Sequence, residues 1–228
     1  MKVTAIIVAA GESKRLPAKK RKPYINLGAR PILIHTLSKF ASFAFIKNIN
    51  LVVNRKDLKI AAKLIQKTNI KKDIKIIKGG KIRSASVYQG LINTPRDCEY
   101  VVIHDAVRPF FKKELLKMLI KQAKKYGASI LATPVKPTIK EVTKNHIIER
   151  TLVRKKLWEA QTPQAFKKDI LIKAYKRAHC GKKKAPDDSS LVEKLGIKVK
   201  IVPSDDENIK ITTPVDLSLA KTLIKKRK

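Results

Sequence analysis

The sequence predicts an α/β protein in which helices cover both faces of a mostly parallel β-sheet. Two observations support this fold class. Short apolar runs alternate with helical patterns along most of the chain, and such repeated β–α units connect parallel strands. The first run, residues 3–9, is continuously apolar and ends just before Gly11, as expected for a strand buried on both faces.

The alternation assigns the remaining elements in order. Strands are expected where short apolar runs lie between polar loops, at residues 3–9, 49–53, 74–77, 100–103, 129–133 and 198–202. Helices are expected where apolar residues recur at helical spacing, at residues 31–45, 56–68, 84–92, 113–126, 168–178, 189–195 and 214–225. Ser84 is a candidate N-cap for the third helix.

A β-hairpin is expected where this rhythm breaks. Residues 138–142 and 147–152 both have strand character, and Lys144 and Asn145 between them indicate a turn. The hairpin could form an antiparallel edge of the sheet or an arm that reaches another subunit. Because no repeat and no linker divides the chain, residues 1–228 are predicted to form one domain with an arm at about residues 136–154.

The composition limits the class of protein. With 228 residues, 43% of them hydrophobic, the chain can bury a sizeable core and is not disordered. No apolar stretch approaches the roughly 18 residues of a membrane span, and residues 1–10 are too short for a signal peptide. We therefore expect a soluble cytoplasmic protein without membrane contact. Cys98 and Cys180 are expected to be buried free thiols, since no partner stands at disulfide-framework or metal-site spacing.

The net charge of +35 has two competing explanations. One is a nucleic-acid partner held by counterion release. The other is a compositional bias in which lysine fills exposed positions without a role. We favour the bias, because the lysines are spread along the whole chain and aromatic residues are only 5% of it, with no RNA-binding aromatic signature. Nonspecific binding to nucleic acid at low salt follows from either explanation.

Polar residues cluster after predicted strands, where ligands bind in open α/β sheets. The first cluster runs from Ala9 to Arg15, and its small residues would let backbone N–H groups approach a phosphate. Neither a P-loop nor a dinucleotide fingerprint is present, so an ordinary tight turn is an alternative. Arg15 and Lys22 stand seven residues apart, and both could reach a polyphosphate.

Three further clusters follow at residues 79–86, 104–110 and 205–212. Asp105, just past a strand end, could hold Mg²⁺ on a nucleotide, since Mg²⁺ takes one or two carboxylates plus substrate phosphates. The alternative is that Asp105 caps a turn and Arg108 pairs with it. Lys210 stands inside an apolar alternation, which marks it as a candidate site residue.

Together these clusters resemble one family. The motifs AAGESKR, GGKIRSASV, HDAVRPF, PVKPTIK, AQTPQAF and NIKIT are similar in order and approximate spacing to those of the 2-C-methyl-D-erythritol 4-phosphate cytidylyltransferases. The resemblance covers nearly the whole chain. It implies a Rossmann-like fold and the transfer of CMP from CTP to methylerythritol phosphate with Mg²⁺. It also implies a homodimer with a shared active site, in which the hairpin is the dimerisation arm that completes the partner's substrate site.

The resemblance also implies roles for four cations. Arg15 and Lys22 would stabilise the transition state, because charge at the reacting phosphate must be met by fixed cations. Arg154 and Lys210 would position the attacking phosphate. Three cations next to Lys22 in the sequence are expected to be solvated bystanders: Lys19, Lys20 and Arg21.

The remaining site residues are likewise implied by the resemblance. Asp105 would meet the ribose or the metal, and the Ser86 hydroxyl would help select cytosine. The other nucleotide-binding positions, which act largely through backbone groups, are Ala9, Ala10, Gly11, Gly80 and Ala106. The substrate pocket would be lined by Thr138, Arg108 and Thr162, some of them across the dimer interface. Four residues depart from the family pattern and put ribose contacts and loop rigidity in question: Ser13, Lys81, Pro137 and Pro186.

Three alternatives remain open from the sequence. The nearest is a cytidylyltransferase for another polyol phosphate, such as ribitol 5-phosphate, which shares the first loop and the RPF and QTPQ motifs. The second is a basic nucleic-acid-binding protein that reuses this fold. The third is an inactive relative with a structural role, which the intact Arg15, Lys22, Arg154 and Lys210 argue against.

Overall fold

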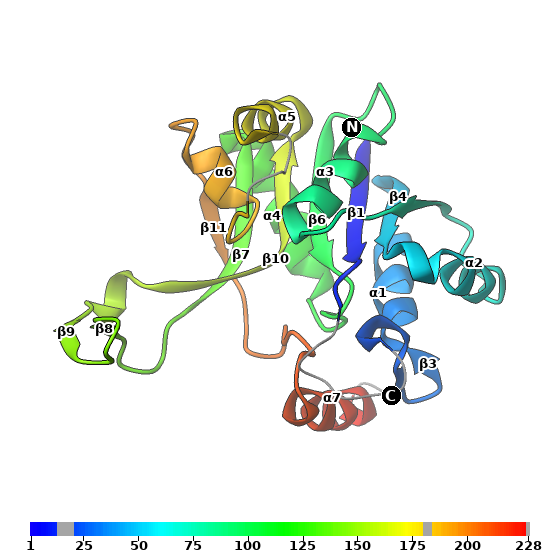
Figure 1. Ribbon diagram of the computed structural model, residues 1–228. Coiled ribbons are helices and arrows are strands. Elements are labelled where there is room, and N and C mark those ends of the chain that lie inside the picture. The colour runs from blue at the N-terminus through cyan, green and yellow to red at the C-terminus, as the bar shows by residue number, and fades with distance from the viewer. Residues whose placement is uncertain (13–20, 180–183, 227–228) are drawn as a thin grey trace.

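The protein is built on a seven-stranded sheet, as Figure 1 shows for this computed structural model. The structure describes residues 1–12, 21–179 and 184–226. The strand order is β11-β7-β10-β6-β1-β4-β5. All neighbours are parallel except those of β10, which confirms the mostly parallel sheet. The strands are β1 (Val3–Ala9), β4 (Ile46–Val53), β5 (Asp73–Lys78), β6 (Tyr100–Asp105), β7 (Ala128–Pro134), β10 (Trp158–Lys167) and β11 (Lys200–Pro203).

Strand β10 was not expected from the sequence. It runs antiparallel between β6 and β7 and shifts register between Gln161 and Gln164. Residues 161–166 are buried, yet Gln161, Thr162 and Gln164 interrupt the apolar pattern that marks a buried strand. These polar side chains form hydrogen bonds in the structure. The strand can therefore be buried although its sequence is partly polar.

Helices cover both faces of the sheet, as predicted (Figure 1). Alternation along β1 divides the core, since Ala5 and Ile7 pack on one face and Ile6 on the other. The first face carries α1 (Ile32–Ala41), α2 (Leu58–Gln66) and α4 (Lys113–Tyr126). The second carries α3 (Arg83–Ile92), α5 (Lys168–Arg177) and α6 (Ser189–Glu193). Helix α7 (Pro214–Lys226) packs with a third cluster around Leu27, Ile32 and Phe110.

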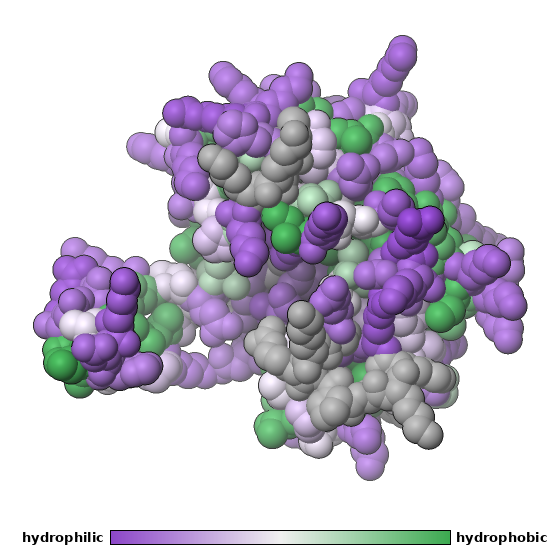
Figure 2. Space-filling view, in the orientation of Figure 1, coloured by the Kyte–Doolittle hydropathy of each residue, from purple (hydrophilic) through white to green (hydrophobic). Residues whose placement is uncertain are grey.

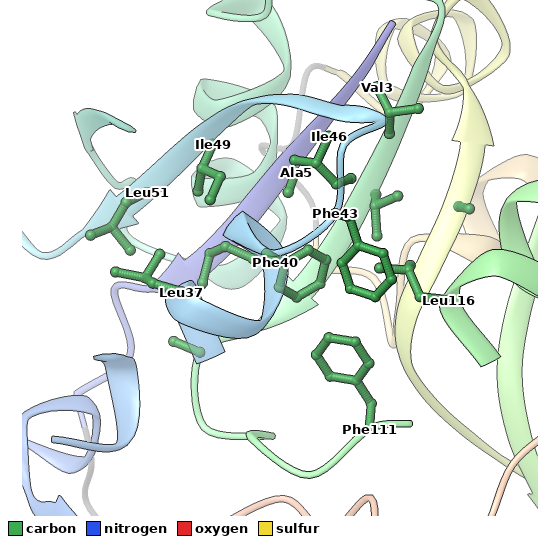
Figure 3. Close-up of a cluster of buried hydrophobic side chains, with 14 of the residues drawn as sticks. Val3, Ala5, Leu37, Phe40, Phe43, Ile46, Ile49, Leu51, Phe111 and Leu116 are labelled. Carbon is green, nitrogen blue, oxygen red and sulfur yellow. The ribbon is translucent and has the colours of Figure 1, made fainter. Parts of the chain in front are cut away.

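Aromatic residues fill the first face of the core. Figure 3 shows Phe40 of α1 close to Phe111, which follows β6; their ring centroids lie 4.9 Å apart. Both side chains are fully buried. Burial of such rings is a principal source of folding free energy, so this cluster fixes α1 and the loop after β6 against each other. Cys98 is a buried free thiol, as predicted, whereas Cys180 lies outside the described residues.

The expected helix at residues 31–45 is shorter than predicted, because α1 ends at Ala41 and Phe45 lies in the turn before β4. The prediction that Ser84 caps α3 is wrong. The N-cap is Ile82, and Ser84 lies buried inside the first turn of the helix. Among the described residues, no helix is long and apolar enough to cross a membrane.

The predicted hairpin is confirmed as β8 (Lys140–Val142) and β9 (Ile148–Thr151), which form a separate antiparallel sheet. Figure 1 shows it projecting from the body of the molecule. The turn is held by the Thr143 hydroxyl, which accepts from the N–H groups of Asn145 and Ile147. His146 in this turn adopts the left-handed conformation, with φ of 61°.

The surface matches the composition. Figure 2 shows hydrophilic side chains over most of the visible face, with apolar residues on the projecting hairpin. Ile147 is 64% exposed and Ile148 is 58% exposed.

Candidate active site

A cavity of about 400 Å³ lies at the carboxyl ends of the neighbouring strands β1 and β6, where the loop after β5 also reaches. This is the expected place for a ligand in an open α/β sheet. Eight of the predicted site residues line it: Ala9, Ala10, Gly11, Lys22, Gly80, Ser86, Asp105 and Lys210. Residues 9–11 follow β1, residues 80–86 follow β5, and Asp105 ends β6. Lys81, a departure from the family pattern, also lines the cavity.

Asp105 lies between two cations at the wall of this cavity. Its Oδ2 is 2.6 Å from Nζ of Lys210, and its Oδ1 is 3.4 Å from Nε of Arg83. Burial raises the pKa of the Asp105 carboxyl, but Arg83 and Lys210 outweigh burial and hold the pKa well below its usual range. Asp105 is therefore ionised, and it places the Lys210 ammonium at the cavity.

The alternative prediction made Asp105 a turn cap paired with Arg108; a turn forms, but the Asp105 carboxylate pairs with Lys210 and Arg83. The Arg108 N–H donates to the Asp105 carbonyl over 3.1 Å, so a turn does form there. The Arg108 guanidinium does not pair with that carboxylate as expected. Instead, its NH1 donates to the Asn208 carbonyl over 2.6 Å in the buried interior. Arg108 thus holds the segment that carries Lys210.

Arg83 is a site residue that the sequence analysis missed. Its NH1 lies 2.8 Å from Oδ2 of Asp188, a fully buried residue that also accepts from the Tyr175 hydroxyl over 2.6 Å. Burial lowers the Arg83 pKa, but Asp188 and Asp105 reverse this effect and raise it, so the guanidinium stays charged. Arg83 stands in the quoted motif GGKIRSASV, and Asp188 lies two residues after Pro186, one of the positions that depart from the family pattern. That location was the available signal.

The loop between β5 and α3 approaches the β1 loop closely. A Cβ added at Gly79 would lie 2.6 Å from Cβ of Ala10 and 3.2 Å from the Val53 carbonyl oxygen. Only glycine fits there without a shift of neighbouring atoms. The Ser86 hydroxyl accepts from the Gly80 N–H at 3.1 Å and lies 3.1 Å from the Ile82 carbonyl. In the structure Ser86 therefore braces the loop that lines the cavity.

Strand β10 contributes to the site from the opposite direction. The Thr162 hydroxyl accepts from the Asp105 N–H over 3.1 Å. The Asn208 side-chain amide donates to Gln161 Oε1 and to the Thr162 carbonyl, over 2.8 and 2.9 Å. These bonds tie β10 to the segment before Lys210, so Thr162 lies behind the cavity wall.

The segment after Lys210 is held by the start of α7. The Asp216 carboxylate accepts from the Thr212 N–H and hydroxyl and from the Thr213 N–H, over 2.8–2.9 Å. Burial raises the pKa of the Asp216 carboxyl, but these bonds together outweigh burial and lower it. Lys210 is therefore fixed on both sides, by Asn208 before it and by Asp216 after it.

Lys22 begins the short 3₁₀ helix η1 (Lys22–Tyr24), whose Pro23 and Tyr24 are buried. The prediction that Arg21 is a solvated bystander is wrong. Its NH1 lies 2.9 Å from Oδ2 of Asp57, whose side chain is only 7% exposed. Nearby sequence could not indicate this pair, because Asp57 belongs to a different β–α unit.

Some predicted residues do not reach this cavity in one chain. Ala106 is buried beneath it, and its N–H donates to the Val8 carbonyl. Thr138 is exposed between β7 and β8. Arg154 begins η3 (Arg154–Lys156) beside the hairpin and donates to the Lys136 carbonyl over 2.6 Å. Arg15 lies outside the described residues.

His104 gives a pH prediction for folding. It is fully buried against Phe40 and Phe111, and burial lowers its pKa from 6.5 to about 3. The unfolded chain binds a proton that the folded chain excludes. The free energy of unfolding should therefore fall by about 1.4 kcal/mol per pH unit between pH 6.5 and 4.5. Urea unfolding at stepped pH measures this slope. His104→Leu should flatten it, whereas the exposed-site control His146→Gln should not; equal slopes in all three proteins would contradict the assignment.

Comparison with known proteins decides the family. The model of the family described as IspD, 2-C-methyl-D-erythritol 4-phosphate cytidylyltransferase, matches residues 3–226. The chain belongs to this family. A relative of the same name from Caldanaerobacter subterraneus subsp. tengcongensis is 40% identical over 99% of this chain and 100% of its own length. One from Syntrophus aciditrophicus is 43% identical over 99% of this chain and 97% of its own length.

Solved structures agree with this assignment to the cytidylyltransferase family. The 4-diphosphocytidyl-2C-methyl-D-erythritol synthase from Anaerococcus prevotii superposes with a TM-score of 0.87 at 33% identity, covering 98% of this chain and 96% of that chain. The 2-C-methyl-D-erythritol 4-phosphate cytidylyltransferase from Thermus thermophilus gives 0.80 at 28% identity, covering 99% and 100%. The family resemblance predicted from the motifs is confirmed.

Proposed function

We propose that this chain transfers CMP from CTP to 2-C-methyl-D-erythritol 4-phosphate in isoprenoid precursor biosynthesis. A phosphate oxygen of methylerythritol phosphate attacks the α-phosphorus of CTP. The bond from that phosphorus to the bridging oxygen breaks, and pyrophosphate leaves. Beyond family membership, one observation carries the proposal. The loop at Gly80, the ammonium of Lys210 on Asp105, and Lys22 of η1 all line the same cavity.

The reaction asks the protein mainly to position groups and to stabilise charge. We assign Lys22, and by resemblance Arg15, to the triphosphate and its transition state. Lys210 binds the attacking phosphate, because Asp105 and the flanking anchors at Asn208 and Asp216 hold its ammonium at the cavity. A fixed cation needs no reorganisation when charge develops, which makes it effective in a transition state.

Cytosine and ribose are assigned to the two loops that meet at the cavity. Backbone groups around Ala9, Ala10, Gly11 and Gly80 face the space where a base would fit, and Ser86 keeps the Gly80 loop in place. A site that hydrogen-bonds a base rejects other bases strongly, because a wrong base leaves buried groups unpaired. Ala106 supports this site from beneath rather than lining it.

A homodimer accounts for the residues that are remote from the cavity. Thr138 and Arg154 lie at the base of the hairpin, which projects from the body and exposes apolar residues (Figures 1 and 2). We propose that the hairpin is the dimerisation arm of a single nucleotidyltransferase domain. It would bring these two residues to the partner's substrate site. Exposed apolar surface on a projecting element is typical of an interaction site.

Mg²⁺ is proposed as the divalent cation, held mainly by the phosphates of CTP. No group of three or more His, Cys, Asp or Glu side chains that could hold a metal occurs among the described residues. Asp105 is an ionised carboxylate at the cavity wall, and one carboxylate together with substrate phosphates fits the ligand set that Mg²⁺ prefers. When bound, Mg²⁺ neutralises phosphate charge.

Pyrophosphate release tests the proposal. With CTP and Mg²⁺, we expect release with methylerythritol 4-phosphate and not with ribitol 5-phosphate. Lys22→Ala should lower kcat/KM by about 10²–10³, as removal of one charge-stabilising group does. Lys20→Ala removes a neighbouring charge of the same basic run and serves as the control. Release with ribitol phosphate alone would overturn the substrate, and no release with either would overturn the enzymatic function.

A further inference from the structure

The ion pair between Arg21 and Asp57 lies next to a residue assigned to catalysis. Arg21 directly precedes Lys22, which lines the cavity. The Arg21 side chain is 25% exposed and that of Asp57 is 7% exposed, with 2.9 Å between NH1 and Oδ2. A largely desolvated pair holds its geometry more tightly than a surface pair, because water screens it less.

Asp57 is itself fixed to the central sheet. Strand β4 ends at Val53, which pairs with Ala9 at the end of β1. The next residue, Asn54, caps the 3₁₀ helix η2 (Arg55–Asp57): its side chain accepts from the Lys56 N–H, and its carbonyl accepts from the Asp57 N–H over 2.8 Å. Asp57 is thus held close to the end of β4, which pairs with the end of β1 at the cavity-lining Ala9.

Lys22 is anchored on its other side by burial. Pro23 and Tyr24 are both buried, and the Tyr24 N–H donates to the Arg21 carbonyl over 2.9 Å. The chain on either side of Lys22 is therefore attached to the body, by Arg21 before it and by Pro23 and Tyr24 after it. The Lys22 backbone between these anchors has little freedom to move.

We propose that Arg21 is a positioning residue that acts through Asp57 to hold Lys22 at the phosphates of CTP. The inference rests on the proposed function, in which Lys22 stabilises the transition state. A displacement of about 1 Å in a positioned group can reduce a rate about 10²-fold. Arg21 contributes this placement without lining the 400 Å³ cavity itself.

The surroundings of Asp57 make the pair necessary. The Tyr24 hydroxyl is buried, and no hydrogen-bond partner for it occurs among the described residues. Burial and the Asp57 carboxylate raise the Tyr24 pKa, so the phenol stays neutral and adds no second negative charge, and it cannot replace a cation. Without Arg21 the buried carboxylate would lose the cation that the structure places on it. The segment from Arg21 to Tyr24 would then rearrange around an uncompensated charge.

The test compares Arg21→Gln with a control of the same charge change. Lys63 lines a side cavity of about 560 Å³ together with Arg21, Tyr24 and Asp57, so Lys63→Gln removes one positive charge from the same neighbourhood. We expect Arg21→Gln to lower kcat by about 10- to 100-fold, with the KM for methylerythritol phosphate little changed and Lys63→Gln near wild type. Arg21→Lys should recover part of the loss, and it also serves if the glutamine variant folds poorly.

A second pair of variants separates positioning of Lys22 from a general structural role. In a Lys22→Ala background, Arg21→Gln should reduce residual pyrophosphate release by no more than about twofold, because the group being positioned is absent. The same large loss in both backgrounds, or Arg21→Gln activity equal to that of Lys63→Gln, would overturn the inference while leaving the proposed function intact. A wild-type chain that releases no pyrophosphate would overturn the proposed function, and the role of Arg21 with it.

Discussion

Lys210→Met should lower kcat/KM by about 10²–10³ while the protein remains folded. The substitution keeps a flexible side chain of similar length but removes the ammonium that lies 2.6 Å from Asp105. Two effects then act in the same direction. The attacking phosphate loses a fixed cation, and the Asp105 carboxylate, left with Arg83, presents less compensated negative charge to an anionic substrate.

Lys112→Met is the matched control for this experiment. Lys112 also pairs with an aspartate, at 3.0 Å from Asp205, but its side chain is 53% exposed. We expect this variant to keep near wild-type kinetics, since exposed ion pairs contribute little. Initial rates of pyrophosphate release across both substrates provide the measurement. A Lys210→Met enzyme within a few-fold of the Lys112→Met enzyme would show that Lys210 is not part of the reaction.

Asp188→Asn should destabilise the fold by about 3–5 kcal/mol, the usual cost of removing one partner from a buried ion pair. Asp188 is fully buried and joins Arg83 to Tyr175. An asparagine can still accept from the tyrosine hydroxyl, but it cannot balance the Arg83 guanidinium. For a chain of this size the Tm should fall by about 6–20 °C.

Asp97→Asn makes the same chemical change at the surface. Asp97 pairs with Lys2, and both side chains are more than half exposed, so the Tm should stay close to that of wild type. Thermal unfolding of the three proteins, followed by circular dichroism, gives the comparison. Equal Tm values for Asp188→Asn and wild type would mean that Arg83 is balanced without Asp188.

Much of the fold could be predicted from the sequence, because the apolar patterns that mark strands and helices are local. Continuous apolar runs such as β1 and amphipathic helices such as α4 are visible within a few residues, and α4 was predicted at its observed bounds. Strand β10 was missed because its buried residues include Gln161, Thr162 and Gln164, whose partners come from distant segments. Hydrogen bonds between distant segments produce no periodic pattern of residues in the sequence.

The same limit applied to the site. The motifs placed eight residues at one cavity, yet the pairings of Arg83 with Asp188 and of Arg21 with Asp57 were not foreseen. In a lysine-rich chain, the residues next to a charged side chain do not show whether that side chain is exposed to solvent or forms a buried ion pair. Only the fold, which brings separate β–α units together, distinguishes them.

The position of β10 has a consequence for synthesis of the protein. Strands β6 and β7 precede β10 in the chain, yet β10 lies between them in the sheet and hydrogen-bonds to both. A chain that stops before Trp158 would leave both edges unpaired and their apolar residues uncovered. Unpaired strand edges promote association with other chains. Prematurely terminated or nascent chains that end before Trp158 should therefore aggregate.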